Sequence, residues 1–288
     1  MFKRSGIAVL IFCMLLTMVV VGLVLASENQ SQDLLSNTTD YSVPFEPGER
    51  LRYEVKWKPI FLVPAFKAGE LTISIKDSHY NGLQAYTLSA TTLSGGLLSS
   101  VVGLEIRDYF ESIIDHTTFK SHKFMRQTRR NTRKRDLEVS FNYEEDSILV
   151  HELNTEFEPP LEIRDEIIQG IPGPVSDILS VFYVARLKPL QPGDSYVIYL
   201  NSRGKIKPVT IEVQVGETIV TPIGSFNSVK IVTVGGLFSN GGDFHIWYST
   251  DQLRIPIRFE ANAKLGKVYG QVIGLETSQM TKSLIEIN

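Results

Sequence analysis

Apolar and polar residues alternate along many short stretches of this chain, and this period of two constrains the fold more than any other feature. In the first such stretch, four large apolar residues alternate with charged ones: Leu51, Tyr53, Val55 and Trp57. Successive side chains of a β-strand point to opposite faces of a sheet, so this stretch buries one face and leaves the other in water. The pattern recurs, with turn signals between the runs, at residues 71–76, 137–143, 209–215 and 255–261.

These runs predict an all-β protein, folded as a curled antiparallel sheet or an open β-barrel of about ten or more strands. One segment has helical spacing instead. Ser176 is a candidate N-cap, and Leu179 and Phe182 follow at helical spacing until Pro189 ends the run. We therefore predict one short helix over residues 176–187, packed on the concave face of the sheet.

The N-terminus predicts export. Residues 8–26 are apolar except for Thr17 and follow Lys3 and Arg4. This stretch is long enough to cross a bilayer as a helix, and it ends in small residues that suit signal cleavage before Ser27. It is interpreted either as a cleaved signal peptide or as an anchor in the inner membrane. In both cases residues 27–288 lie in the periplasm or outside the cell.

The sequence divides into three parts on this basis. Residues 1–26 are the signal peptide or anchor, and residues 27–43 are a flexible polar tether rich in Ser, Asn, Gln, Thr and Asp. Residues 44–288 are expected to form a single β domain.

Composition excludes several classes of protein. The only cysteine, Cys13, lies in the apolar N-terminal stretch, so the exported part has no disulfide, thiolate nucleophile or cysteine-ligated metal site. Without Lys3 and Arg4, 27 basic residues face 32 acidic ones, and the resulting charge of −5 disfavours a general nucleic-acid binder. The five histidines have no metal-ligand spacing, and no nucleophile elbow, P-loop or dinucleotide fingerprint occurs. We expect no catalytic residue, no metal and no cofactor.

A basic run between residues 120 and 135 is the most conspicuous local feature, and it carries eight positive charges. Within it, four arginines are candidates for contact with an anionic lipid or glycan: Arg126, Arg129, Arg130 and Arg133. The segment 136–166 holds 11 acids against the single base Arg164. If these strands pair, opposite charges face each other, and this structural neutralisation is the favoured interpretation.

Several short motifs, taken in order, carry a resemblance to a known family. They are residues 44–57 (PFEPGERLRYEVKW), 68–70 (AGE), 177–180 (DILS), 186–194 (RLKPLQPGD), 221–226 (TPIGSF), 247–251 (WYSTD) and 254–257 (RIPI). With them the chain resembles the bacterial domain-of-unknown-function family 3108, a group of exported envelope proteins. The resemblance implies fold and compartment, and no catalytic residue, because that family has no assigned activity. At the level of fold alone it is also similar to periplasmic carriers of lipoproteins and lipids. The motif residues suit a scaffold, in which Arg254 is expected to pair with Asp251.

These observations favour a non-enzymatic envelope binding or assembly module over a hydrolase, with a structural protein lacking a cavity as the third option. A curled sheet makes an apolar interior, so a lipid, or the lipid part of a lipoprotein, is the expected ligand, and no nucleic acid is expected. Within the loop 93–103, four apolar residues are candidates for a mobile flap over the opening: Leu97, Leu98, Val101 and Val102. The alternative is that these four residues plug the core.

Overall fold

A computed structural model describes residues 43–60, 64–95, 103, 105–131, 133–234, 244–263 and 266–277. The predicted flap residues Leu97, Leu98, Val101 and Val102 and the N-terminal segment lie outside the described residues. The strands are β1 (Arg50–Pro59), β2 (Phe66–Tyr80), β3 (Leu83–Ser94), β4 (Ile106–Asp115), β5 (Ser121–Arg130), β6 (Arg133–Asn142), β7 (Ser147–Asn154), β8 (Leu161–Gln169), β9 (Val175–Asp177), β10 (Ser195–Ser202), β11 (Lys205–Thr221), β12 (Gly224–Val234), β13 (Phe244–Ser249), β14 (Pro256–Ala263) and β15 (Gly266–Glu276). Between β9 and β10 lies the helix α3 (Val181–Leu187).

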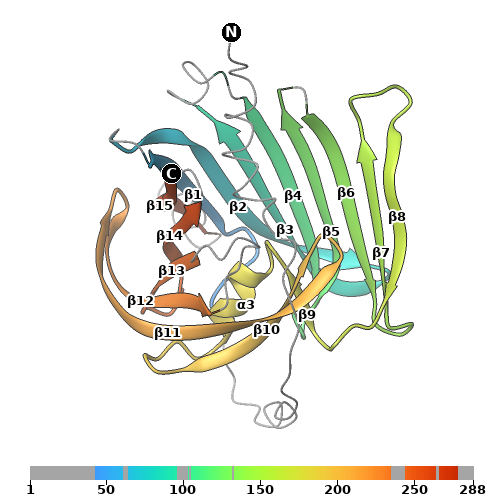
Figure 1. Cartoon of the computed structure of the whole chain (residues 1–288). Coiled ribbons are helices and arrows are strands. Elements are labelled where there is room, and N and C mark those ends of the chain that lie inside the picture. The colour runs from blue at the N-terminus through green and yellow to red at the C-terminus, as the bar shows by residue number, and fades with distance from the viewer. Residues whose placement is uncertain are drawn as a thin grey trace, which may run out of the picture.

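All fifteen strands belong to one sheet, in the order β8-β7-β6-β5-β4-β3-β2-β1-β15-β14-β13-β12-β11-β10-β9. Neighbouring strands are antiparallel, except that β9 and β10 are parallel. Strand β1 pairs with β15, so a near-N-terminal and a near-C-terminal strand join the two halves of the sheet. Figure 1 shows the sheet curling around α3, with β2–β8 as one wall and β10–β15 curving back toward it. The predicted all-β curled sheet with one short packed helix is confirmed.

The inner face of the sheet follows the alternation of the sequence. In β1 the side chains of Leu51, Tyr53, Val55 and Trp57 are all buried. They join an apolar core that continues across the inner faces of the other strands. Burial of this continuous apolar face drives the sheet to curl on itself rather than lie flat.

Helix α3 begins later than the sequence predicted. Residues 175–177 form β9 and pair with β10, so Ser176 is a strand residue and Ser180 is the N-cap. The carboxylate of Asp177 accepts hydrogen bonds from the backbone N–H groups of Leu179 (2.8 Å) and Ser180 (2.9 Å), which makes the turn before the helix. The predicted start at Ser176 is therefore wrong, because the Asp177 turn separates a short strand from the helix.

We call the place where the sheet closes on itself the seam. There β9 contacts the inner face of β4 and β5, and the β10–β11 turn contacts the inner face of β7. Among the described residues β8 and β9 are the sheet ends and do not pair with each other. Side chains close the seam instead: Asp177 accepts hydrogen bonds from the Ser112 (2.5 Å) and Ser121 (2.7 Å) hydroxyls. In the β10–β11 turn, Gly204 has a φ of +83°, and a Cβ there would lie 2.4 Å from Val150 Cγ2. The seam is thus closely packed but has no ladder of backbone hydrogen bonds.

The β4–β5 turn carries a test of stability against pH. Burial alone would raise the pKa of Asp115, but hydrogen bonds from Thr118, Thr117 and His122 outweigh it and lower the pKa from 3.8 to about 2. This contribution to stability is therefore fully present above pH 3.8 and is lost as pH falls toward 2. We expect Asp115→Asn to cost roughly 1–2 kcal/mol of unfolding free energy at pH 6 and much less at pH 2. Urea unfolding at both pH values measures the difference, and an equal cost at both would contradict the assignment.

Candidate functional site

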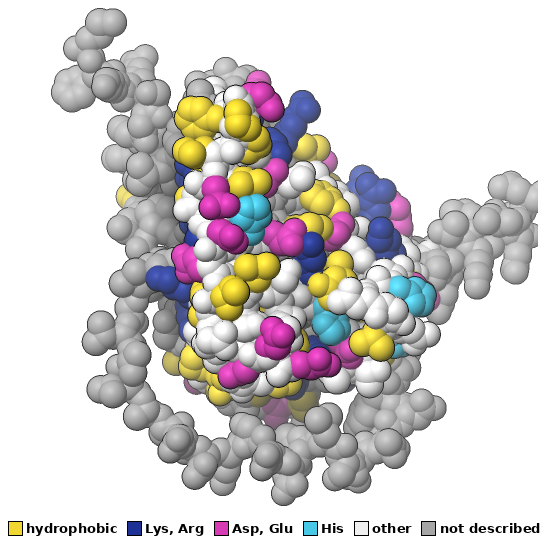
Figure 2. All heavy atoms as spheres, turned by 90° about the vertical axis from the view of Figure 1, so that its right-hand side faces the viewer, with side chains coloured by type: hydrophobic (Ala, Val, Ile, Leu, Met, Phe, Trp, Pro, Cys, Tyr) yellow, Lys and Arg dark blue, Asp and Glu magenta, His cyan; other side chains and the backbone are white. Residues whose placement is uncertain are grey.

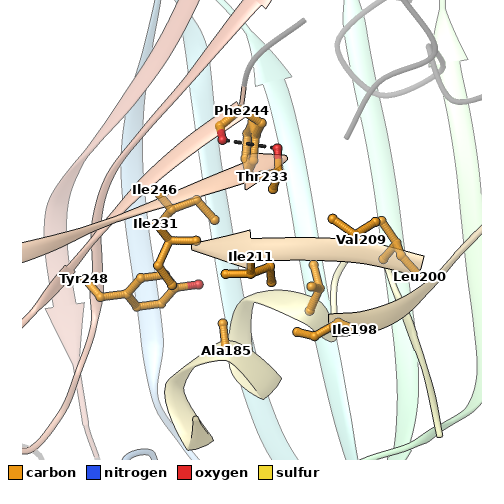
Figure 3. A pocket seen from close by; sticks show the side chains of 11 residues that line it. Ala185, Ile198, Leu200, Val209, Ile211, Ile231, Thr233, Phe244, Ile246 and Tyr248 are labelled. Atoms are coloured by element: carbon orange, nitrogen blue, oxygen red, sulfur yellow. Dashed lines mark hydrogen bonds between the residues drawn. The ribbon is translucent and has the colours of Figure 1, made fainter. Parts of the chain in front are cut away.

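An apolar hollow lies between α3 and the inner faces of β10–β13 (Figure 3). It is lined by eleven residues: Val181, Ala185, Ile198, Leu200, Val209, Ile211, Ile231, Thr233, Phe244, Ile246 and Tyr248. Figure 3 shows Ala185 pointing from α3 toward the strands, opposite Ile211. Strand alternation places every second residue of β10–β13 on this wall, and helix spacing places Val181 and Ala185 on the facing side.

The polar side-chain atoms of the lining are already bonded to the backbone. The Tyr248 hydroxyl donates to the carbonyl oxygen of Phe182 at 3.1 Å, and the Thr233 hydroxyl donates to that of Phe244 at 3.5 Å. Burial raises the pKa of Tyr248 well above its ordinary value, so it stays a neutral phenol. The hollow therefore presents hydrocarbon surface and no titrating group near neutral pH.

The hollow is small. Its volume is about 20 Å³, room for little more than one water molecule. A larger apolar ligand would fit only if α3 moved away from the strands.

A buried ion pair holds the C-terminal end of α3 in place. The guanidinium of Arg186 donates to both carboxylate oxygens of Glu49, at 2.7 and 2.8 Å, and both side chains are 1% exposed. Arg186 also donates to the carbonyl oxygens of Leu253 (2.7 Å) and Pro44 (2.5 Å). Desolvation would lower the pKa of Arg186, but Glu49 outweighs it and raises that pKa. This cluster joins the residues before β1, the helix and the β13–β14 loop into one scaffold.

Arg254 also belongs to this scaffold, although not in the predicted way. Its guanidinium donates to the carbonyl oxygens of Arg186 (2.9 Å) and Lys188 (3.0 Å) at the end of α3. Only the backbone N–H of Arg254 contacts the Asp251 carboxylate, at 3.1 Å. The expected side-chain pair between Arg254 and Asp251 is wrong, because the helix carbonyls at its C-terminal end attract the cation instead.

The four arginines predicted to contact an anion lie on both faces of the sheet. Arg126 and Arg130 point inward from β5 and are 2% and 4% exposed, while Arg129 points outward and pairs with Asp136 at 2.5 Å. Arg133 is half-buried at the start of β6. An anionic contact of these residues stays a prediction.

The inward arginines belong to a cluster that the sequence analysis did not foresee. Arg130 forms an ion pair with Asp108 of β4, whose side chain is fully buried. Across the seam, Arg203 of the β10–β11 turn donates to Glu152 of β7 at 2.5 Å. A signal did exist in the sequence, because charged residues occupy inward positions of an alternating strand.

The edge strand β8 is exposed except at Arg164 and Ile168, which are half-buried, and Figure 2 shows the side of the molecule on which it lies. Its apolar residues Leu161, Ile163 and Ile167 are 56%, 43% and 68% exposed. Acidic side chains lie between them in the sequence, and Figure 2 shows the two kinds intermixed on this face. Charges on an edge strand hinder edge-to-edge pairing with another sheet.

Two further observations bear on chemistry. Nowhere in the described part of the chain do three His, Cys, Asp or Glu side chains gather where they could hold a metal ion. Within the same residues, no helix has the length and apolar character needed to span a bilayer.

Comparison with known proteins gives a family and a fold. The family model described as "Protein of unknown function (DUF3108)" matches residues 52–272. No match was found among curated proteins.

Comparison with solved structures gives matches from several bacteria. The chain is similar to a β-barrel-like protein of the unknown-function family DUF1849 from Brucella abortus, with a TM-score of 0.53 and 9% identity, over 81% of this chain and 98% of that one. Two further matches have TM-scores of 0.30 and 0.31: a protein described as exported, with a YmcC-like fold, from Bacteroides fragilis, and one described as a lipoprotein from Parabacteroides distasonis. Their identities are 11% and 12%, over 82% and 83% of this chain and 99% and 100% of theirs. The match to the Brucella abortus protein shows a shared fold.

Proposed function

We propose that this chain, which belongs to the DUF3108 family of proteins of unknown function, is a non-enzymatic binding module of the cell envelope that holds an apolar chain such as a lipid acyl group. The observation that carries the proposal is the hollow between α3 and β10–β13, whose lining turns hydrocarbon inward and binds its own polar groups to the backbone. A site that presents only hydrocarbon selects for apolar ligands.

The fold provides a way for the hollow to enlarge. Helix α3 has only seven residues, and its C-terminal end is held by the ion pair of Arg186 with Glu49. Movement of the start of α3 away from β10–β13 would enlarge the hollow, and it breaks the hydrogen bond from the Tyr248 hydroxyl to the Phe182 carbonyl. An acyl chain that entered would replace the contacts that the lining residues lose.

The basic, apolar N-terminus supports a place outside the inner membrane, reached through a cleaved signal peptide or as an anchored protein. An apolar ligand in that compartment is most simply a membrane lipid or the lipid part of a lipoprotein. The inner membrane is a further partner if the N-terminal segment stays attached.

A structural role without ligand is the second candidate, and the small volume of the hollow favours it. A filled core of this kind needs no ligand to be stable. The two candidates differ in what co-purifies with the protein and in what fills the hollow.

The test uses Ala185→Leu, which places a larger side chain in the hollow, and Val197→Leu as its control. Val197 lies on β10 but is 54% exposed and does not line the hollow. The protein is expressed from its full coding sequence in a bacterium with an envelope. Bound lipid is then extracted for mass spectrometry, and binding of a fluorescent fatty acid is titrated.

We expect the wild type and Val197→Leu to carry lipid and to bind the fatty acid alike. Ala185→Leu should bind it at least tenfold more weakly, because the added carbons occupy the ligand's place, and circular dichroism checks that it is folded. Absence of lipid and of fatty-acid binding in the wild type would remove this function and leave the structural module.

A further inference from the structure

A row of polar side chains crosses the inner face of the sheet beside the seam. The register places Thr92, Asp108, Thr128, Arg135 and Asn154 opposite one another on β3, β4, β5, β6 and β7. Adjacent strands lie about 4.8 Å apart, so neighbours in this row are within reach of one bound group. The rest of this inner face is largely apolar, which makes the row an exception.

The next row of the inner face adds further charge. Arg126 lies opposite Phe110 and Leu137, and Glu152 lies beyond Leu137. Arg203 reaches this group from the β10–β11 turn through its contact with Glu152. We define the arginine cluster as four cations and two carboxylates: Arg126, Arg130, Arg135, Arg203, Asp108 and Glu152.

The cluster has two more positive than negative charges in a largely buried place. The side chains of Asp108, Glu152 and Arg130 are each 3% exposed or less. Burial, together with the nearby cations Arg203 and Arg130, lowers the pKa of Arg126 to about 10, so it remains charged at neutral pH. An anionic group that reached this place would meet the positive charge of four arginines.

Several hydrogen-bond donors of the arginine cluster and of the polar row beside it have no acceptor among the described residues. The hydroxyls of Thr92 and Thr128 and the Nε atoms of Arg135 and Arg203 are buried, and among the described residues they have no hydrogen-bond partner. Thr92 and Thr128 are 5% and 2% exposed and lie on either side of Asp108. Buried donors without acceptors are rare in folded proteins and each needs an explanation.

An apolar residue would suit the position of Arg126, whose cross-strand neighbours Phe110 and Leu137 are both buried in the core. A hydrophobic replacement of a buried charge is often neutral or stabilising. We therefore expect Arg126→Met to remove this charge without destabilising the fold.

We propose that the arginine cluster, with Thr128 and Thr92 beside it, binds a phosphate or phosphate monoester group at the seam. Such a group carries negative charge, opposite to that of the four arginines, and its oxygens accept several hydrogen bonds from arginine and threonine donors at once. The group approaches from the β10–β11 turn, where the Arg203 side chain is 27% exposed. This site is distinct from the apolar hollow and does not depend on it.

The test measures binding of inorganic phosphate, dodecyl phosphate and uncharged dodecanol to the full chain by calorimetry and thermal shift. Arg126→Met removes a cation from the cluster, and Thr128→Val removes one donor with little change of shape. Arg129→Met is the matched control, since Arg129 lies on the same strand, points outward and pairs with Asp136.

We expect phosphate to raise the melting temperature of the wild type and of Arg129→Met. Arg126→Met should bind phosphate at least tenfold more weakly and Thr128→Val about fivefold more weakly, while neither melts below the wild type without phosphate. No response of the wild type to either phosphate compound, or an equal loss in Arg129→Met, would overturn the proposal.

The same titrations separate the sources of the group and the two sites. Dodecyl phosphate binding at least tenfold more tightly than inorganic phosphate assigns the group to a lipid, and equal affinity assigns it to free phosphate. Dodecanol reports on the apolar hollow alone, so its failure to bind would count against the proposed function while leaving the phosphate site intact.

Discussion

Glu49→Ala is expected to destabilise the protein by about 3–5 kcal/mol, because it leaves the guanidinium of Arg186 buried without its carboxylate. The two side chains are 1% exposed and share two hydrogen bonds of 2.7 and 2.8 Å. The loss should also loosen α3, since Arg186 connects the helix to residues before β1 and in the β13–β14 loop. Urea unfolding followed by circular dichroism measures the cost.

Arg52→Ala is the matched control, because its ion pair with Glu276 is 3.9 Å long and about half exposed on both sides. We expect it to cost about 0–1 kcal/mol. The double variant Glu49→Met with Arg186→Met should be less destabilised than Glu49→Ala, since no lone charge remains buried. A cost of Glu49→Ala no larger than that of Arg52→Ala would contradict the scaffold role.

Asp177→Ala is the second change with a large expected effect, about 3 kcal/mol or more, because one carboxylate bonds to four donors. Those donors are the hydroxyls of Ser112 and Ser121 and the backbone N–H groups of Leu179 and Ser180. Loss of the carboxylate leaves these buried donors without their acceptor and releases β9 from β4 and β5. The same unfolding assay gives the magnitude.

Asp165→Ala provides the comparison, since Asp165 is exposed on the edge strand β8. It should change stability by no more than about 0.5 kcal/mol. Ser112→Ala should fall between the two, at about 1–2 kcal/mol, because it removes one of the four donors. If Asp177→Ala cost no more than Asp165→Ala, the seam would not depend on this carboxylate.

The sheet and its inner face could be predicted because strand alternation is a local signal. Leu51 and Trp57 are buried where the period of two placed them. The pairing of β1 with β15 could not be predicted, because residues more than 200 positions apart meet there and no local pattern specifies them. The start of α3 was misplaced because β9 has only three residues, too few to show a period.

The arginine cluster shows a different limit. Arg126 and Arg130 were noticed for their charge, but their direction follows from the register of β5, which the basic run obscured. The contact of Arg203 with Glu152 joins residues 51 positions apart across the seam and leaves no mark in the sequence. The sequence did carry one signal of the cluster. On β5, Arg126 and Arg130 share the inward face with the apolar Phe124.

Amide hydrogen exchange with and without dodecanol tests most directly whether the hollow under α3 is the binding site. The account predicts that dodecanol slows exchange in α3 and in the parts of β10–β13 that line the hollow, while exchange in β6–β8 stays unchanged. In Ala185→Leu this protection should be lost. Unchanged exchange in α3 and β10–β13 at saturating dodecanol, or protection confined to β6–β8, would contradict it.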